Sequence, residues 1–423
     1  MSEKPTAIDL FAGCGGLSLG LKRAGFQTLF AVEAHDDAFE TYKHNLLDQP
    51  DSESLWPDWL AKKAWSAEDL IQHHRKELIG LRSKVDLIAG GPPCQGFTTN
   101  GLRRPDDPRS KLVDVYLEYV ALLLPKAVLL ENVRGFTSMK HSSGGTYSDY
   151  VERKLDALGY DVWKDIIRAS EWGVPQRRPR FVLIAIKQDQ AQAFAPESAL
   201  ENMRSAFLNQ RGLGDRPISA KSAISDLDTK PENYVEDADW AHRGFQQLVR
   251  SSRAKNSYQR LMRKGCRKQP SDMRLPRHTD STKARLNSIL TTCVRGQCLS
   301  DNDRDRLGIN KQSITPLDPT SPAPTVSTLP DDFIHYAQPR IMTVREHARL
   351  QSFPDWFEFK GPYTSGGKQR RGACPRYTQI GNAVPPLLAE AMGLYLLDLI
   401  RANGVENFDH FTDGAGVRRK SAA

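Results

Sequence analysis

The stretch that most constrains this chain runs from residue 85 to residue 97 and reads Val-Asp-Leu-Ile-Ala-Gly-Gly-Pro-Pro-Cys-Gln-Gly-Phe. Its mainly apolar start is typical of a short buried strand, which the glycine pair ends. Pro92 and Pro93 fix φ and remove two donors, so Cys94 stands on a rigid loop beyond the strand's carboxyl end. Ligands bind at that edge of open α/β sheets. A thiol there is either a nucleophile, if its pKa falls, or a buried structural cysteine.

The start of the chain predicts a βαβ unit that holds a nucleoside. The expected elements are a strand at residues 6–11, a glycine turn at 13–16, a helix at 17–24 and a strand at 27–32. Glu33 ends the second strand, where an acid can hold ribose hydroxyls, although a solvated strand-end carboxylate would look the same. Ser18 replaces the third glycine of a dinucleotide fingerprint. S-adenosylmethionine, which has no pyrophosphate, is therefore favoured over a dinucleotide.

A second acid, Glu131, ends a continuous apolar strand at residues 127–130. An ionised carboxylate in such a place is costly when unpaired, so it needs a partner or a raised pKa. Glu131 is thus either a proton donor to a ring nitrogen or a salt-bridged structural residue. Arg178 and Arg180 alternate with a proline ahead of an expected strand, so both point to one face. As a bare pair, two such arginines can simply cap acids.

The charge of the chain is concentrated in one segment. Residues 241–311 hold 17 Lys or Arg against 5 Asp, a local net charge of +12 in a chain whose total is +8. Such an asymmetry indicates a polyanionic partner. Aromatic residues are sparse there, with Tyr258 the clearest, so groove and phosphate contacts are favoured over stacking on single strands.

Composition excludes several other classes of protein. No run approaches the roughly 18 apolar residues of a membrane span, and no signal-peptide pattern opens the chain, so we expect a cytoplasmic protein. The six cysteines are scattered without CxxC pairs, so neither a disulfide framework nor a metal site is predicted. Five prolines in residues 315–330 indicate a stiff connector. Residues 343–353 predict an amphipathic helix, capped by Thr343 with Glu346 at the capping-box position.

Five motifs follow one another in the order typical of the cytosine-5 DNA methyltransferases, and the chain resembles that family through them. They are Asp9-Leu-Phe-Ala-Gly-Cys-Gly-Gly16, Gly91-Pro-Pro-Cys-Gln-Gly-Phe97, Glu131-Asn-Val133, Gln176-Arg-Arg-Pro-Arg180 and Gln379-Ile-Gly-Asn-Ala-Val-Pro385. The resemblance covers both ends of the chain and leaves only the region from about residue 190 to about residue 340 without a firm match.

The resemblance implies an α/β fold, namely a Rossmann-like S-adenosylmethionine-dependent methyltransferase domain with a smaller inserted target-recognition domain. We expect the catalytic, cofactor-binding domain at residues 1–192 and 366–404. The basic target-recognition domain would occupy residues 193–365, and a disordered tail residues 405–423. Residues 98–109, rich in Arg, Pro and Asp, would form the loop that closes over a flipped base.

The resemblance also assigns roles to single residues. Cys94 would be the nucleophile that adds to cytosine C6, Glu131 would donate to N3, and Arg178 and Arg180 would hold the base and a phosphate. No metal is required. Residues in several motifs would bind S-adenosylmethionine: Phe11, Ala12, Gly13, Gly15, Gly16, Glu33, Pro93, Leu112, Asn382 and Val384. The contact to the adenine amino group stays open between Glu68, Asp69 and neither.

We therefore predict methyl transfer to C5 of cytosine within a specific duplex-DNA sequence, through base flipping and a covalent adduct of Cys94 with C6. Two alternatives stay open. One is a tRNA cytosine-5 methyltransferase, since one branch of the family modifies RNA with the same motifs. The other is a catalytically silent DNA-binding protein of the same fold. The expected partners are double-stranded DNA and, genetically, a restriction endonuclease, and the expected state is a cytoplasmic monomer that binds no membrane.

Overall fold

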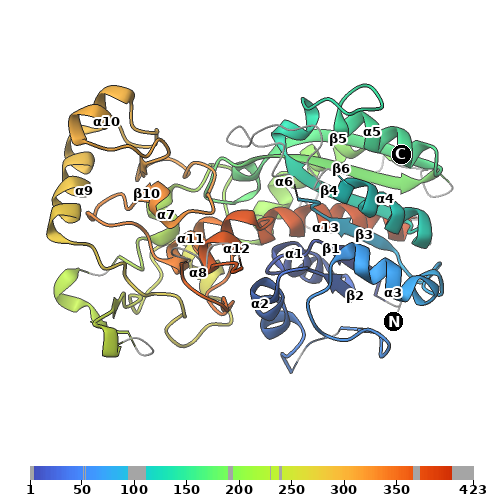
Figure 1. Ribbon diagram of the computed structural model, residues 1–423, viewed down its shortest axis with the longest axis horizontal. Helices are drawn as coiled ribbons and strands as arrows, with labels where there is room; N and C mark the ends of the chain where they lie inside the picture. Colours follow the sequence, from blue (N-terminus) through green and yellow to red (C-terminus); the bar gives the residue numbers. More distant parts are fainter. Residues whose placement is uncertain are drawn as a thin grey trace, which may run out of the picture.

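The computed structural model folds into two lobes that differ in regularity (Figure 1). One lobe, which we call the sheet lobe, holds a six-stranded sheet with helices on both faces; the other, the second lobe, holds short helices and two-stranded pairings. Cys94, the expected loop at 98–109 and the expected tail at 405–423 lie outside the residues that the structure describes. The described residues are 4–50, 52, 54–93, 111–188, 194–228, 230–237, 241–364 and 372–402.

The central sheet has the order β2-β1-β3-β4-β6-β5. Its strands are β1 (Thr6–Leu10), β2 (Gln27–Val32), β3 (Leu87–Gly90), β4 (Ala127–Val133), β5 (Tyr160–Arg168) and β6 (Pro179–Lys187). The first four strands pair in parallel, whereas β6 runs antiparallel to both β4 and β5. The short apolar runs of the sequence therefore form one buried sheet, and the predicted α/β fold class is confirmed.

The strand order reverses between β1 and β3, because the chain goes from β1 to β2 on one side and later adds β3 on the other. Leu10 and Gly90, which end these two strands, are register partners, so the segments that follow leave the sheet together. The antiparallel β6 begins where β4 ends, and Arg180 pairs with Val133. One sheet edge thus collects the ends of four motif-bearing strands.

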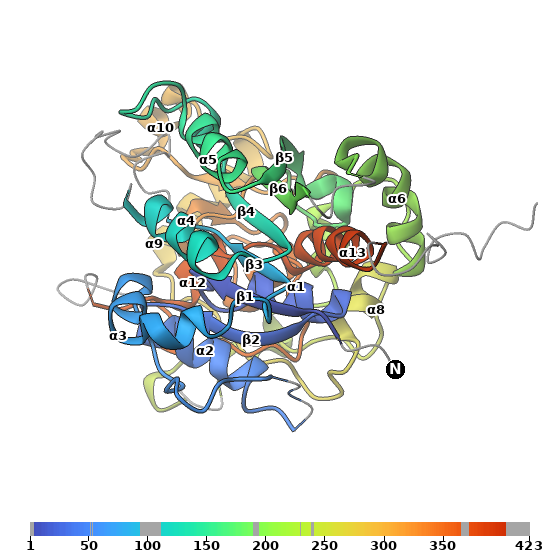
Figure 2. The same cartoon turned by 90° about the vertical axis from the view of Figure 1, so that its right-hand side faces the viewer.

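Two helical layers cover the sheet (Figure 2). One layer contains α3 (Ala67–Ile79), α4 (Lys111–Leu123) and α5 (Tyr147–Asp156), and the other contains α1 (Gly16–Ala24), α6 (Pro196–Gln210) and α13 (Pro386–Ala402). Helix α2 (Asp36–Leu46) follows β2, and the 3-10 turns η2 (Arg134–Thr137) and η3 (Ala169–Trp172) follow β4 and β5.

Helix α13 packs along α1 and joins the end of the chain to its beginning. A Cβ added to Gly20 would lie 2.4 Å from the Ala389 Cβ, so the two helices touch through backbone. Together with α12 (Arg376–Asn382), α13 makes one apolar stretch, Arg376–Arg401, that is long enough to cross a membrane by length and composition. Burial of 83% of its most apolar window inside the protein is the property of a core helix.

The second lobe is built from short elements. Its helices are α7 (Ala220–Ile224), α8 (Ser257–Arg263), α9 (Asp280–Thr292), α10 (Asp301–Leu307) and α11 (Val344–Leu350). Its strands are β7 (Val235–Glu236), β8 (Gln246–Gln247), β9 (Thr315–Pro316) and β10 (Phe333–Ile334), and its 3-10 turns are η5 (Pro231–Asn233), η6 (Ala241–Arg243) and η7 (Pro330–Asp332). Strand β7 pairs with β8, and β9 pairs with β10.

Helix α11 is held by buried ion pairs. Its predicted capping box is confirmed, since Thr343 and Glu346 bond reciprocally at its start. Its polar face is not exposed to solvent, however, because all seven of its residues are buried. Arg349 pairs with Asp226 and Asp355. Burial alone would raise the pKa of Glu346, but the guanidinium of Arg340 beside it lowers that pKa to about 2. Charges that look solvent-facing in the sequence are thus paired inside the protein.

The segment after β6 packs on the sheet lobe rather than with the second lobe. Helix α6 buries Leu200, Met203 and Phe207 in the main apolar core, and Arg211 just after it pairs with Glu390 of α13. The predicted domain boundary at residue 193 therefore falls ahead of a helix that belongs with the sheet lobe.

The proline-rich segment at 315–330 also differs from its prediction. It is not a bare connector, because the backbones of Ala323 and Gln176 form a parallel bridge, and Val326 donates its N–H to the Gln176 side chain. This segment instead forms part of the seam between the lobes.

Candidate active site

The turn after β1 brings backbone N–H groups to the reversal point of the sheet. Phe11 has a φ of +60°, Gly13 of +55° and Gly15 of +96°. Left-handed backbone costs a residue with a Cβ about 1 kcal/mol, so Phe11 is strained while the two glycines are not. Strain of this kind is typical of ligand-binding turns. The turn is closed by the Gly15 N–H, which donates to the Ala12 carbonyl at 2.9 Å.

Glu33 lies beside this turn, at the end of β2. One of its carboxylate oxygens accepts the Gly13 N–H at 2.9 Å, and the other accepts the His35 N–H at 2.8 Å. Burial raises the pKa of Glu33, while the two N–H donors oppose that rise. Each oxygen keeps a free lone pair, so the carboxylate can also accept two adjacent ribose hydroxyls. We call Phe11, Gly13 and Glu33 the nucleoside cradle, after the ligand that the sequence predicts for them, and keep this term below.

The last motif returns to the cradle. A Cβ on Gly16 would lie 2.3 Å from the Val384 carbonyl oxygen, so only glycine allows this approach. Asn382 is exposed and Val384 half-buried beside the start of α1. Ser18 occupies the place of a third glycine and donates its hydroxyl to Asp9 at 2.6 Å. The Ser18–Asp9 hydrogen bond therefore joins α1 to β1. In a dinucleotide site, a glycine at this place lets the helix pack closely on the strand.

Other residues near the cradle are less fully placed. The backbone N–H of Trp65 donates to the Glu33 backbone carbonyl, which holds the segment before α3 beside the cradle. Glu68 and Asp69 are exposed in the first turn of α3. Pro93 and Leu112 lie on either side of residues 94–110, which the structure does not describe, and their roles toward the cofactor stay predictions.

The residues that follow β3 and lead to Cys94 are held in place by residues of β4. Asn132 is buried and donates its amide to the Pro92 carbonyl at 3.0 Å. A Cβ on Gly91 would lie 3.2 Å from a carboxylate oxygen of Glu131. The backbone at Gly91, three residues before Cys94, therefore lies against the Glu131 carboxylate. Asn132 stands next to Glu131 in the Glu-Asn-Val motif, but from the sequence we predicted a role only for Glu131.

Glu131 and Arg180 form an ion pair at this edge. The Arg180 Nε lies 2.9 Å from a Glu131 oxygen, and the two side chains are only 10% and 12% exposed. The register of β4 and β6 makes this pair possible, since Glu131 lies opposite Val182 and Arg180 opposite Val133. The sequence predicted that a carboxylate at this strand end needs a charged partner unless it is neutral, and Arg180 is that partner. A paired acid and guanidinium can bind the polar edge of a planar base.

Arg178 does not share this position. It is 1% exposed, and its guanidinium donates to the backbone carbonyls of Val326, Gly381 and Ala383 at 3.0–3.3 Å. The expectation that Arg178 faces a nucleotide is therefore not supported, because its donors are directed at the protein backbone. Arg178 joins the start of β6 to the segment beside the cradle and to the second lobe.

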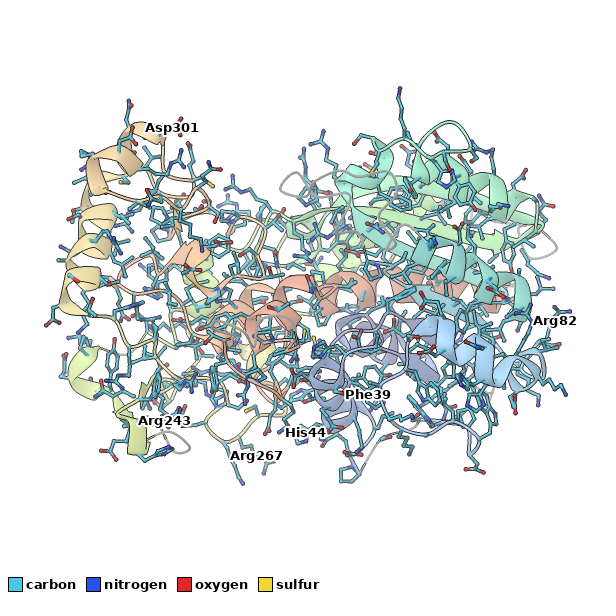
Figure 3. The ribbon with its side chains drawn as sticks, in the orientation of Figure 1. Phe39, His44, Arg82, Arg243, Arg267 and Asp301 are labelled. Atoms are coloured by element: carbon cyan, nitrogen blue, oxygen red, sulfur yellow. The ribbon has the colours of Figure 1, made fainter. Side chains whose placement is uncertain are left out.

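The basic segment divides into exposed and structural residues. Arg253, Arg260 and Arg267 are exposed, and Arg267 points outward at the rim of the second lobe (Figure 3). Arg263 instead pairs with Asp226, and Tyr258 is buried with its hydroxyl donating to the Arg349 carbonyl. Tyr258 is thus a core residue and not a platform for bases.

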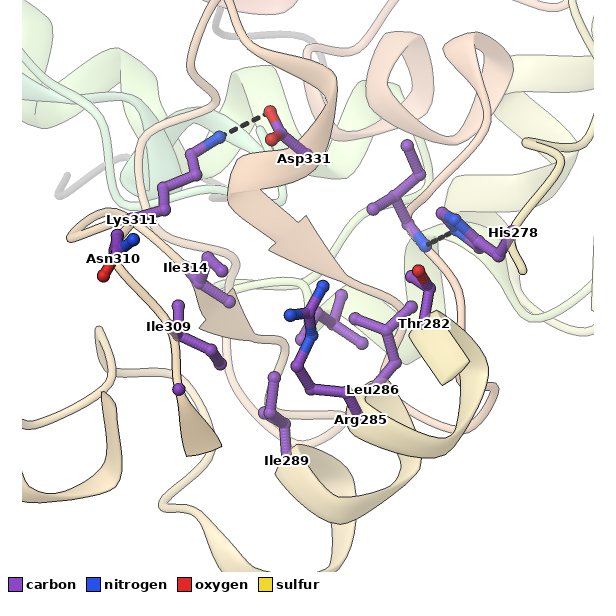
Figure 4. Close-up of a pocket in the computed structure, with 13 residues that line it drawn as sticks. His278, Thr282, Arg285, Leu286, Ile289, Ile309, Asn310, Lys311, Ile314 and Asp331 are labelled. Atoms are coloured by element: carbon purple, nitrogen blue, oxygen red, sulfur yellow. Dashed lines mark hydrogen bonds and ion pairs between the residues drawn. The ribbon is translucent and has the colours of Figure 1, made fainter. Parts of the chain in front are cut away.

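A cavity of about 400 Å³ lies in the second lobe (Figure 4). Leu286 and Ile289 of α9 line its floor, and Arg285 and the ion-paired Lys311 and Asp331 stand at its rim. None of its lining residues belongs to the six-stranded sheet or to the segments that leave its edge. This cavity is therefore separate from the cradle and from the Glu131–Arg180 pair.

In the described part of the chain, the cysteines form no disulfide and the possible metal ligands form no cluster. Its five cysteines, at positions 14, 266, 293, 298 and 374, are free, and no group of His, Cys, Asp and Glu there could hold a metal ion. Cys14 is buried, and burial raises the pKa of its thiol well above the ordinary range. Cys14 is therefore an inert neighbour of the cradle.

The sheet order, the antiparallel β6 and the cradle define the class, which is that of the Rossmann-like methyltransferase domains. The chain belongs to the C-5 cytosine-specific DNA methylase family, whose family model matches residues 6–397. The family indicated by the five motifs is thereby confirmed. Membership makes the chain a DNA (cytosine-5-)-methyltransferase.

Named relatives agree with this assignment. The chain is 33% identical over 401 residues to the Type II methyltransferase M.DdeI of Desulfomicrobium norvegicum, covering 91% of this chain and 86% of that protein. It is 31% identical to the Type II methyltransferase M.XorII of Xanthomonas oryzae pv. oryzae, covering 94% and 86%. A crystal structure described as a DNA modification methyltransferase encoded within an E. coli prophage matches with a TM-score of 0.61 and 26% identity, over 93% of this chain and 99% of that one.

Proposed function

We propose that this enzyme transfers a methyl group from S-adenosylmethionine to C5 of a cytosine within a specific sequence of duplex DNA. The observation that carries the proposal is the Glu131–Arg180 ion pair, which lies against the exit that leads to Cys94. The nucleoside cradle opens at the neighbouring strand ends of the same edge. A cofactor and a base held at these two places would meet within one site.

The cradle fits S-adenosylmethionine. Glu33 would hold the ribose hydroxyls, Phe11 would lie against the adenosyl group, and Val384 would close the side next to α1. Binding of this cofactor would use backbone N–H groups and a carboxylate but no phosphate-binding glycine loop. The presence of Ser18 in the third-glycine position agrees with this. When bound, S-adenosylmethionine would supply an electrophilic methyl group to C5 and leave as the thioether S-adenosylhomocysteine.

The residues of this chain would make cytosine C5 nucleophilic. The Cys94 thiolate would add to C6 while Glu131 gives a proton or a strong hydrogen bond to N3, so that electron density builds up at C5. Arg180 would hold Glu131 in place and bind the base's carbonyl edge. After methylation a base takes the C5 proton, and the C6–S bond breaks to release Cys94. No step needs a metal.

The second lobe would hold the duplex while the cytosine is flipped out. A ring inside a duplex is out of reach, and flipping costs a few kcal/mol. Phosphate contacts from the basic segment at 241–311 would offset that cost. Because two relatives carry the name Type II methyltransferase, we infer a genetic pairing with a restriction endonuclease and action in a bacterial cytoplasm. That the enzyme acts as a monomer stays a prediction.

The test supplies the protein with S-adenosylmethionine and either a random-sequence DNA duplex or bulk tRNA, and maps 5-methylcytosine after bisulfite conversion. We expect methylation at one short DNA motif, and its loss in Cys94→Ala with cofactor affinity retained. Methylation confined to tRNA would replace DNA with RNA as substrate. Methylation of neither, by a folded protein that binds DNA, would instead favour a silent DNA-binding protein.

A further inference from the structure

A tight turn at residues 294–297, between α9 and α10, is anchored on the sheet lobe. The Arg177 guanidinium donates to the Gly296 carbonyl at 2.8 Å, and the Gly296 N–H donates to the Pro316 carbonyl at 2.7 Å. Gly296 has a φ of +74°, and a Cβ there would lie 3.1 Å from the Asp318 Cβ. This glycine therefore fixes the path of the turn.

The residues around Gly296 hold the turn as well. Arg295 donates to the Leu290 carbonyl at 2.9 Å and to the Tyr336 carbonyl. Beyond the turn, the Leu299 N–H donates to the Ile314 carbonyl at 2.9 Å. The turn is thus tied to α9, to the residues after β10 and to those before β9, and is preorganised for contact.

Two side chains of this turn, Val294 and Gln297, are exposed to solvent in the described part of the chain. Val294 is 66% exposed, the highest value for a large apolar side chain in the described part of the chain. Gln297 is exposed, and its amide has no hydrogen-bond partner among the described residues. A single exposed valine is ordinary by itself. It becomes informative because a firmly held turn presents it next to a free amide.

The position of the turn makes it relevant to the reaction. Arg177, which anchors it, precedes Arg180 by three residues, and an extended chain advances about 3.3 Å per residue. The anchor therefore lies about 10 Å along the chain from the Glu131–Arg180 pair. Successive base pairs are about 3.4 Å apart, so a duplex with its target cytosine at that pair would have several neighbouring base pairs within a similar distance of about 10 Å.

Resting on the function proposed above, we propose that the turn at 294–297 reads base edges next to the target cytosine in duplex DNA. Gln297 is the hydrogen-bonding reader, since a primary amide offers the donor and acceptor that adenine presents in the major groove. Val294 is the apolar reader, whose methyl groups match the thymine methyl. The net charge of +12 on residues 241–311 identifies the partner as a polyanion.

The experiment compares the methylation motifs of four variants with that of the wild type on a random-sequence duplex. Gln297→Ala and Val294→Ala test the turn. Gln72→Ala and Ile79→Ala are matched controls, because both residues are exposed on α3 at the far end of the sheet lobe. We expect Gln297→Ala to lose about tenfold in discrimination at one or more motif positions, with smaller losses for Val294→Ala and none for the controls. A motif unchanged in both turn variants overturns the proposal.

A binding assay separates this proposal from the proposed function. The ratio of affinities for the preferred duplex and for a duplex with single-base changes is measured for each folded variant, with the preferred duplex selected by binding. A ratio that falls toward one in Gln297→Ala supports the reading turn even if a variant transfers no methyl groups. An unchanged ratio overturns it. Absence of methylation by the wild type on any DNA overturns the proposed function instead.

Discussion

Arg180 and Glu131 lie on antiparallel neighbours, β6 and β4, and meet as an ion pair with 2.9 Å between the guanidinium Nε and a carboxylate oxygen. The pair is almost closed off from solvent, so its attraction is screened far less than on a surface. Gly91 places the start of the Cys94 loop against the same carboxylate. The position of this ion pair thus depends on one antiparallel strand in an otherwise parallel sheet.

The first prediction concerns Glu131. Glu131→Gln keeps the shape and removes the acid, so we expect the rate of methyl transfer in a single turnover to fall by about 10²- to 10⁴-fold. Affinity for S-adenosylmethionine should stay unchanged, because Glu131 is not part of the cradle. Rapid-quench transfer of a labelled methyl group gives the rate, and calorimetry gives the affinity. A rate within a few-fold of wild type would remove Glu131 from the reaction.

The second prediction separates Arg178 from Arg180. Arg178→Met removes donors from three enclosed backbone carbonyls, so the free energy of unfolding should fall by about 2–5 kcal/mol. Arg75→Met is the matched control, because Arg75 pairs with Glu118 on the surface, where such a pair contributes about 0–1 kcal/mol. Urea titrations measure both. Equal stability of the two variants would return Arg178 to the candidates for nucleotide contact.

The third prediction concerns the pH dependence of stability. Burial raises the pKa of Asp9 from 3.8 to about 7. The folded protein therefore binds an extra proton between these values, and its stability falls as the pH rises through that window. Asp9→Asn keeps an acceptor for Ser18 and removes the charge. It should gain about 2–4 kcal/mol over wild type at pH 8 and nothing near pH 4. Parallel urea curves for the two proteins from pH 4 to pH 8 would contradict the prediction.

The fourth prediction concerns the exposed arginines of the second lobe. Replacing Arg253, Arg260 and Arg267 together by alanine should weaken DNA binding and lower the slope of log affinity against log salt by about 2–3. Arg263 is left in place because its ion pair with Asp226 supports the fold. Fluorescence anisotropy across a salt series measures the slope.

The control for that measurement removes the same charge elsewhere. Lys62, Lys76 and Lys84 are exposed on the sheet lobe, in and around α3. Their triple alanine variant should leave the salt slope near that of wild type. If both triple variants lower the slope equally, net charge and not the second lobe governs binding.

The sheet lobe could be predicted closely because its signals are local. Apolar runs bounded by glycine gave the strands, and residues 27–32 form β2 with the predicted limits. The position of Glu33 at the end of that strand was also predicted correctly, while its role toward a cofactor stays a prediction. The antiparallel direction of β6 was not predicted, because strand pairing depends on residues far apart in the sequence.

The second lobe could not be predicted in the same way. Polar residues of α11 suggested an exposed face, yet Arg349 finds Asp226 across 123 residues of sequence. Tyr258 looked available to DNA in the sequence, but its hydroxyl bonds to Arg349 in the core, and Arg263 of the same basic segment is paired with Asp226. Arg178 shows the same limit within a motif, since its three carbonyl partners lie some 150–200 residues further along the chain. Composition shows where charged residues are concentrated along the sequence, but only the folded structure shows which of them are already paired inside the protein.

The contact of Gly16 with the Val384 carbonyl has a consequence for synthesis of the protein. The first motif leaves the ribosome early, but one wall of its cradle is encoded near the other end of the gene. On the proposed function, we therefore expect a nascent or truncated chain to lack cofactor binding, and methylation competence to begin only when translation is almost finished. Two fragments divided between these motifs would regain cofactor binding only by reassembling, which makes this methylase a natural scaffold for a split reporter.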